Sequence, residues 1–293
     1  MLQPKIADFS ATRHILKTFK LRASKRLGQN FLIDSEVVQK IVEAAEISEG
    51  DEVLEIGPGI GTLTQGLLEV GAKVTAVELD KKLPAVLEKT LAGYENFKLV
   101  QGDILKVDLK NLIPESFKVV ANLPYYITTQ ILLTLLEKKL PITKIVTMVQ
   151  REVAERMTAA PGSKIYGALS VAVQFRADVK IAFDVPPTAF LPRPEVTSSV
   201  VVCDVREKFK VADEDFFIKV VRAAFGQRRK TLLNALTGAG FQREAVLKSL
   251  DAAEISPSRR AETLSLEDFA RLAEKIISTK RKDKPKIAIA SSL

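Results

Sequence analysis

The segment Glu55-Ile-Gly57-Pro-Gly59-Ile-Gly61 is a glycine-rich turn that indicates the fold class. It follows a short run rich in apolar residues, 51–56, and precedes residues 62–70, whose pattern predicts a helix. Glycines in such a turn tolerate positive φ and let a ligand approach the backbone closely. The N-terminus of the following helix adds partial positive charge. The stretch therefore predicts a strand–turn–helix unit that holds a ligand over its turn.

The spacing of these glycines separates two classes of nucleotide-binding protein. Dinucleotide-dependent enzymes favour G-x-G-x-x-G, with the third glycine further along the chain. The sequence has G-x-G-x-G instead, which suits the variant found in methyltransferases better. A purely structural tight turn remains the alternative explanation of this motif taken alone.

Outward from this turn, predicted strands and helices alternate. Strands are expected at 51–56, 73–78, 97–100, 117–121 and 144–149, and helices lie between them. Such alternation indicates an α/β fold with a mostly parallel sheet. Two strands then follow in succession, 179–185 and 197–205, which predicts an antiparallel pair at one sheet edge.

Beyond residue 206 the strand patterns stop, and all further elements are predicted helices, including one over 229–236. We therefore expect a small all-helical C-terminal domain. The expected division of the chain is a basic N-terminal arm at 1–30, an α/β domain at 31–205, a helical domain at 206–278 and a flexible basic tail at 279–293.

The composition restricts the classes of function. The formal net charge of +8 favours an anionic partner, nucleic acid before a membrane surface, although a generic basic protein is the alternative. The single cysteine and single histidine, Cys203 and His14, argue against disulfides, metal centres and histidine-based catalysis. The sequence has no apolar run long enough for a transmembrane helix and no signal-peptide pattern, so we expect a cytoplasmic protein.

Polar residues recur where the predicted strands end. Glu78 ends the second strand, where a carboxylate can accept hydrogen bonds from both hydroxyls of a ribose. Asp103 follows the third strand and can accept from an adenine amino group, while Ile104 covers a ring face. Taken alone, Glu78 has a solvated strand-end acid as its alternative interpretation, and Asp103 has an ordinary turn residue. Their recurrence at one sheet edge predicts a ligand site, because ligands bind there in open α/β sheets.

The most specific motif is Asn122-Leu123-Pro124-Tyr125, directly after the fourth strand. The exocyclic amine of adenine is a poor nucleophile because its lone pair is delocalised into the ring. The Asn122 side-chain oxygen and the backbone carbonyl of Leu123 or Pro124 can accept both amine hydrogens, and Tyr125 can stack on the extruded base. Such catalysis needs positioning and electrostatics but no strong base, in keeping with a chain that has one histidine.

Five segments together match one protein family. They are 26–32, 55–61, 122–127, 190–198 and 225–232. They resemble the ribosomal RNA adenine dimethyltransferases of the bacterial KsgA type, over about residues 10–278. The resemblance implies a Rossmann-like seven-stranded methyltransferase sheet, a small helical C-terminal domain and S-adenosylmethionine as cofactor. It further implies dimethylation of two adjacent adenines near the 3′ end of 16S rRNA within an immature small ribosomal subunit. The charge of the chain suggests a monomer that docks on this large partner, with a dimer as the alternative.

The motif match and the strand ends together assign residues to the site. The expected cofactor-binding residues are Gln29, Asn30, Leu32, Glu55, Gly57, Gly59, Glu78, Leu79, Asp103, Ile104 and Asn122. The expected catalytic residues are Asn122, Leu123, Pro124 and Tyr125. Tyr125 is also expected to hold the target adenine, with Phe190 as a second stacking surface. No metal is expected.

Basic residues suggest where RNA phosphates bind. Arg228, Arg229 and Lys230 in the helical domain suit phosphate contacts, as does the basic arm at 1–30. A solvated helix face and a solvated tail are the alternatives for these two segments.

Four other functions compete with this interpretation. A 23S rRNA methyltransferase shares the cofactor motifs, but segment 225–232 favours the small-subunit enzyme. A DNA adenine methyltransferase typically has Pro-Pro where this chain has Leu123-Pro124. The glycine spacing disfavours an NAD-dependent dehydrogenase. A non-enzymatic checkpoint in ribosome assembly is disfavoured by the intact motif at Asn122.

Overall fold

The chain divides into two compact units in the computed structural model, which describes residues 5–113, 115–207, 209–227 and 229–282. The first unit comprises Met1–Thr158 and Ala177–Arg206, and the second comprises Ala159–Arg176 and Glu207–Leu293. Residues 159–176 thus belong to the helical unit, whereas the sequence placed them in the α/β domain. The reason lies in their aromatic contacts: the Phe175 ring stacks on Phe217 with ring centroids 4.3 Å apart.

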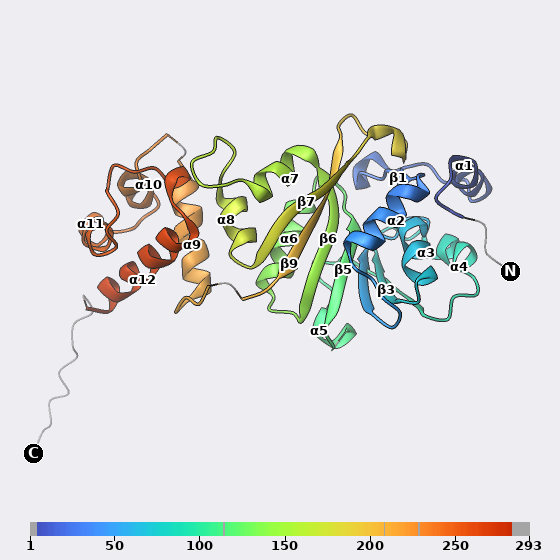
Figure 1. The fold of residues 1–293 in the computed structure, drawn as a ribbon, viewed down its shortest axis with the longest axis horizontal. Helices are drawn as coiled ribbons and strands as arrows, with labels where there is room; N and C mark the ends of the chain where they lie inside the picture. The colour runs from blue at the N-terminus through green and yellow to red at the C-terminus, as the bar shows by residue number, and fades with distance from the viewer. Residues whose placement is uncertain (1–4, 114, 208, 228, 283–293) are drawn as a thin grey trace, which may run out of the picture. The chain divides into compact units, whose positions relative to one another are not determined.

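The first unit is built on a seven-stranded sheet with strand order β4-β3-β2-β5-β6-β9-β7 (Figure 1). The strands are β2 Glu52–Ile56, β3 Lys73–Glu78, β4 Phe97–Gln101, β5 Phe117–Asn122, β6 Ile142–Gln150, β7 Ala177–Val185 and β9 Ser198–Val205. The five from β4 to β6 are parallel, and β9 pairs antiparallel with both β6 and β7. Both the parallel sheet and the antiparallel strands at one edge confirm the predictions.

Helices cover the sheet of the first unit. They are α1 Phe9–Thr18, α2 Ser35–Ala44, α3 Thr62–Glu69, α4 Pro84–Thr90, α5 Leu109–Leu112, α6 Thr128–Glu137 and α7 Arg151–Thr158. Local chemistry fixes where they begin: Asp34 caps α2 by accepting hydrogen bonds from two backbone N–H groups, and Pro84 occupies the first turn of α4. The central strand β2 lies in a dry interior, since Val53 and Leu54 are fully buried.

The N-terminal segment packs on the first unit, contrary to its prediction as a separate arm. Ile6 and Ala7 are buried in the core of this unit, and the Ile6 N–H donates to Gln65 Oε1 at 2.8 Å. A short 3-10 helix, η1 Lys25–Leu27, then leads into strand β1 Phe31–Leu32. Apolar burial therefore anchors this segment despite its basic composition.

A small two-stranded sheet joins two segments that are distant in sequence. Strand β1 pairs antiparallel with β8 Phe190–Leu191, with Phe31 opposite Leu191 and Leu32 opposite Phe190. The short 3-10 helix η2 Pro187–Ala189 precedes β8. The sequence did not predict either strand, because two residues are too few to show a periodicity.

The second unit is helical. Its elements are α8 Ala168–Gln174, α9 Glu214–Phe225, α10 Leu232–Gly238, α11 Arg243–Ala252, the 3-10 helix η3 Ala261–Thr263 and α12 Leu266–Lys282. Two boundaries differ from the predictions. Helix α10 begins at Leu232 rather than at 229, and α12 continues through 279–282, which were expected in a flexible tail. The rest of that predicted tail lies outside the described residues.

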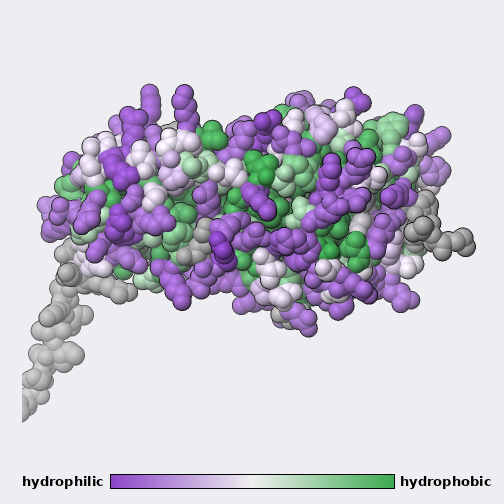
Figure 2. All heavy atoms as spheres, in the orientation of Figure 1, coloured by the Kyte–Doolittle hydropathy of each residue, from purple (hydrophilic) through white to green (hydrophobic). Residues whose placement is uncertain are grey.

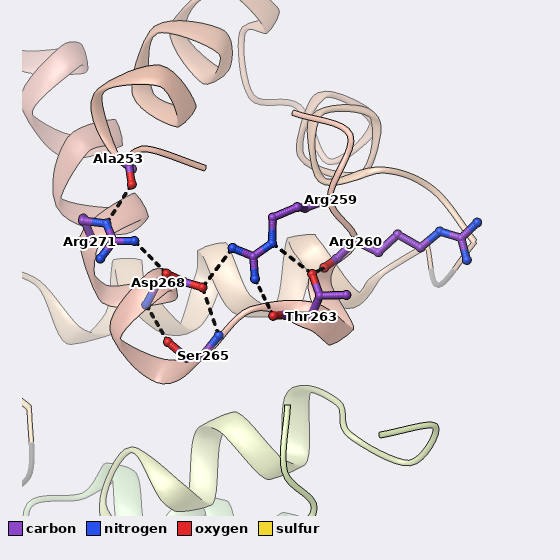
Figure 3. Close-up of polar contacts among 7 residues, drawn as sticks. All are labelled: Ala253, Arg259, Arg260, Thr263, Ser265, Asp268 and Arg271. Atoms are coloured by element: carbon purple, nitrogen blue, oxygen red, sulfur yellow. Dashed lines mark hydrogen bonds and ion pairs between the residues drawn. The ribbon is translucent and has the colours of Figure 1, made fainter. Parts of the chain in front are cut away.

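A polar cluster fixes the start of α12 (Figure 3). Asp268 accepts from Arg259 Nη1 at 3.1 Å and from Arg271 Nη2 at 2.7 Å. Ser265 caps the helix, because its Oγ accepts from the Asp268 N–H. The Arg260 side chain extends away from this cluster (Figure 3). The polar groups of the cluster thus bind one another and hold loop and helix together.

One face of the molecule shows a mainly polar surface (Figure 2). On the face drawn in Figure 2, hydrophilic side chains cover most of each unit and hydrophobic residues form scattered patches. Within the described residues, no helix is both long enough and apolar enough to cross a membrane.

Candidate cofactor and adenine site

A pocket lies at the carboxyl edge of the parallel strands of the first unit. It is lined by residues 27–32, 55–60, 62–63, 77–79, 83, 102–104, 122–127 and 131. The carboxyl ends of four neighbouring strands, β4, β3, β2 and β5, meet there. All eleven residues expected to bind the cofactor and all four expected to be catalytic line this one pocket.

The glycine-rich turn forms one wall of the pocket. Gly57, Gly59 and Gly61 all have positive φ, at 71°, 62° and 93°. Such φ angles strain any residue with a Cβ, so the turn requires glycine. At Gly57 an added Cβ would meet no atom within 4 Å, so open space lies directly against the backbone. The turn therefore leaves the space that the predicted close approach of a ligand requires.

The Glu78 carboxylate accepts hydrogen bonds from two backbone N–H groups and can accept more. Its Oε2 accepts from the Gly59 N–H at 3.3 Å and its Oε1 from the Asp80 N–H at 2.7 Å. Burial raises the pKa of this carboxyl, while the two backbone donors oppose that rise. Each carboxylate oxygen retains a further lone-pair site. The geometry therefore suits acceptance of two hydroxyl groups from a ribose.

Glu55 lies deeper, with 1 % of its surface exposed. Within the described residues its Oε2 has no hydrogen-bond partner. Burial raises the pKa of Glu55 to about 8, and the nearby Glu78 adds to the rise. A buried acceptor without a partner is costly. Its place in the pocket lining makes the Glu55 carboxyl available to a ligand. The protonated form can exchange hydrogen bonds with a polar ligand group, and a cationic group bound beside it would favour the ionised form.

Asp103 and the loop at residues 27–32 line two further sides of the pocket. One oxygen of Asp103 accepts from the Leu105 N–H at 3.1 Å, as in a turn aspartate, and the other can serve a ligand. Gln29 spans the pocket rim, donating to Asp80 Oδ2 at 2.9 Å and accepting from the Ser24 N–H at 2.8 Å. The Gln29 side chain thus acts as a tether for the loop as well as a wall residue.

The orientation of the Asn122 amide follows from one hydrogen bond. Its Nδ2 donates to the backbone oxygen of Asn30 at 3.2 Å, which assigns Oδ1 as the remaining acceptor. The Pro124 carbonyl already accepts from the Ile127 N–H and from Thr128 Oγ1, at 3.2 and 2.9 Å. Two donors occupy both lone pairs of that carbonyl. Of the two predicted carbonyl partners for an amine, Leu123 is the one that the geometry favours.

Tyr125 is anchored at its hydroxyl. The phenol and Ser198 Oγ lie 2.7 Å apart in a hydrogen bond, and burial raises the pKa of the phenol. Ser198 begins β9, so this contact links the motif loop to the antiparallel edge of the sheet. Sequence reasoning missed Ser198, because nothing local marks a partner 73 residues away.

Phe190 does not fit its predicted role as a stacking surface in this structure. Its ring is 1 % exposed, belongs to the apolar core and does not line the pocket. Pairing of β8 with β1 holds it inside. Another aromatic residue of the pocket, Tyr126, is 60 % exposed and was not singled out, although it directly follows the predicted motif.

The predicted phosphate-binding residues belong to the second unit. Arg229 and Lys230 are exposed, precede α10 and do not line the pocket. Arg228 lies outside the described residues. His14 lies on α1, also outside the pocket lining.

A glycine-rich turn under a parallel sheet edge, an acid at the next strand end and an Asn-Leu-Pro-Tyr loop together define a methyltransferase of the Rossmann-like class. The model of one family, ribosomal RNA adenine dimethylase, matches residues 20–278. The chain belongs to that family, and it is an S-adenosylmethionine-dependent enzyme that dimethylates adenines of ribosomal RNA.

Individual relatives agree with this membership. The chain is 47 % identical over 284 residues to ribosomal RNA small subunit methyltransferase A of Clostridioides difficile, covering 94 % of this chain and 98 % of the relative. The protein of the same name from Moorella thermoacetica is 50 % identical over 280 residues, covering 92 % and 97 %.

Solved structures show the same fold. A dimethyladenosine transferase from Plasmodium falciparum superposes with a TM-score of 0.75 at 27 % identity, covering 85 % of this chain and 98 % of that one. The 23S rRNA methyltransferase ErmE gives 0.66 at 27 % identity, covering 85 % and 100 %.

Proposed function

We propose that the enzyme acts on two adjacent adenines near the 3′ end of 16S rRNA, within an immature small ribosomal subunit. The names of its relatives with 47–50 % identity support the small subunit rather than the large one as substrate. The proposed enzyme works as a cytoplasmic monomer. The observation that supports an adenine amine as the methyl acceptor is the Asn122 amide, which is tethered to Asn30 with its oxygen left to accept, in the same pocket as Glu78.

The residues of the pocket fit S-adenosylmethionine. Glu78 suits the ribose hydroxyls, Asp103 and Ile104 suit the adenine, and the buried Glu55 oxygen suits the cationic part of the cofactor. The open backbone at Gly57 leaves room for the chain that joins these groups. Bound there, the cofactor supplies an electrophilic methyl group on a sulfonium sulfur.

The role of the chain in the reaction is to prepare the adenine amine. Asn122 Oδ1 and the Leu123 carbonyl accept the two amine hydrogens, which draws the lone pair out of conjugation with the ring. Tyr125 stacks on the base from a loop that Ser198 and Thr128 hold in place. The methylated amine loses its proton to water, so the chemistry needs no histidine at the site.

Methyl transfer from labelled cofactor tests this proposal. The acceptors are 30S subunits from a strain that lacks this methylation, with 23S rRNA and duplex DNA in parallel. Label in dimethyladenosine of the 30S sample alone is the expected result. Label in 23S rRNA alone would assign the enzyme to the large subunit. Cofactor binding without transfer to any acceptor would indicate an assembly factor that has lost its activity.

A further inference from the structure

Tyr126 is an exposed aromatic side chain at the rim of the pocket. It is 60 % exposed, whereas its neighbour Tyr125 is partly buried and hydrogen-bonded to Ser198. A ring exposed at the rim of a substrate pocket offers a surface on which a nucleobase can stack. The two adjacent tyrosines therefore serve different purposes.

The position of the Tyr126 ring depends on Gly28. A Cβ on Gly28 would lie 3.5 Å from Cδ1 of the ring and 3.4 Å from the Pro124 Cβ, so the ring sits against the glycine backbone. Gly28 has φ of 59°, a conformation that favours glycine, and it ends the 3-10 helix η1. The loop is fixed in turn by Gln29, which bridges Ser24 and Asp80. The exposed ring thus has a rigid support.

Basic side chains lie directly beside this support. Lys25 and Arg26 are exposed on η1, three and two residues before Gly28. Within the part of the chain that the structure describes, neither forms an ion pair. One short segment thus carries unpaired cations and, at Gly28, supports an exposed aromatic ring. Proteins combine these two features to bind single-stranded nucleic acid, where bases stack on aromatic rings and cations neutralise phosphates.

We propose that Tyr126 stacks on the nucleobase next to the target adenine, and that Lys25 and Arg26 bind the phosphates of that nucleotide. The inference deepens the proposed function and rests on it. Phe190, the other candidate for a second stacking surface, is buried in the core. Tyr126 is a positioning residue in this account, since it touches RNA beside the reacting base and leaves the chemistry to Asn122.

Kinetics with 30S subunits from a strain lacking the methylation test the proposal. For Tyr126→Ala we expect KM for the subunit to rise about tenfold, in the range of one lost base–aromatic stack. The kcat should stay within about twofold, and the Kd for S-adenosylhomocysteine should not change. Tyr126→Phe keeps the ring and should behave as wild type. Phe9→Ala removes another exposed aromatic side chain, 48 % exposed on α1 and outside the pocket lining, and should leave KM unchanged.

The salt dependence of subunit binding tests the phosphate contacts. For Lys25→Gln with Arg26→Gln, the slope of log affinity against log salt should fall by one to two. A KM of Tyr126→Ala within twofold of wild type, or an equal rise in Phe9→Ala, would overturn the proposal. A wild-type enzyme that transfers no methyl group to the 30S subunit would overturn the proposed function itself.

Discussion

The pocket of the first unit and the polar cluster at the start of α12 use similar side chains for opposite purposes. In the cluster, both oxygens of Asp268 accept hydrogen bonds from arginines. In the pocket, Glu55 Oε2 is buried without a partner among the described residues, and Glu78 and Asn122 keep acceptors to spare. Satisfied polar groups stabilise a fold, whereas groups left with unused capacity are available to a ligand. Substitutions in the pocket should therefore affect activity more than stability. Substitutions in the cluster should affect stability more than activity.

The largest expected effect is on catalysis. Asn122→Ala removes the acceptor that prepares the amine. The kcat should fall by a factor between about a hundred and a thousand, which raises the activation free energy by about 3–4 kcal/mol. The Kd for S-adenosylhomocysteine should change less than about threefold, and the melting temperature by no more than a few degrees. Single-turnover transfer with 30S subunits measures the rate. A variant that retains most of its activity would remove Asn122 from the catalytic machinery.

The pH dependence of stability should reveal Glu55. Its pKa in the folded chain, about 8, lies above the ordinary 4.5, so folding favours the protonated form. Its contribution to stability is complete below pH 4.5 and is lost as pH rises through 8, by at most about 1.4 kcal/mol per pH unit. Urea unfolding from pH 5 to 9 measures this, and Glu55→Gln should flatten the profile. Parallel profiles for variant and wild type would contradict the assignment.

In the helical unit the expected effect is on stability alone. Asp268→Ala removes the acceptor shared by Arg259, Arg271 and the Ser265 N–H, and because both arginines are partly exposed it should cost about 1–2 kcal/mol. Hydrogen exchange of α12 amides measures this loss locally. Arg260→Ala is the control, because that side chain extends away from the cluster (Figure 3) and should change stability by less than about 0.5 kcal/mol. Equal protection of α12 in the two variants would show that the cluster does not hold the helix.

The smallest effect concerns the tether at the rim. Gln29→Ala removes the bridge from Ser24 to Asp80 and loosens one wall of the pocket. We expect cofactor affinity to fall about tenfold, or about 1.4 kcal/mol, with kcat at saturation nearly unchanged. Isothermal titration with S-adenosylhomocysteine provides the measurement. A loss confined to kcat would mean that Gln29 acts on the adenine side instead.

The sequence predicted those parts of the molecule that local patterns encode. The alternating strands and helices gave the sheet, and Gly57, Glu78, Asp103 and Asn122 could be placed together because parallel strands end at one edge. The membership of the family is likewise confirmed by the match over 20–278.

What the sequence could not predict depends on pairs of residues far apart. Strand β1 pairs with β8, which places Leu32 opposite Phe190. Phe190, predicted to stack on the adenine, is therefore buried in the core. The same holds for the Tyr125–Ser198 hydrogen bond and for the packing of 159–176 into the helical unit. Burial and long-range hydrogen bonds carry no periodic signal, so they appear only in three dimensions.

A crystal structure of the protein with S-adenosylhomocysteine would show whether the pocket of the first unit holds the cofactor. We expect the ligand to lie in that pocket, with its ribose hydroxyls within hydrogen-bond distance of Glu78 and its sulfur towards Asn122. A ligand bound elsewhere, or bound in the pocket with its ribose away from Glu78, would contradict the assignment of the site.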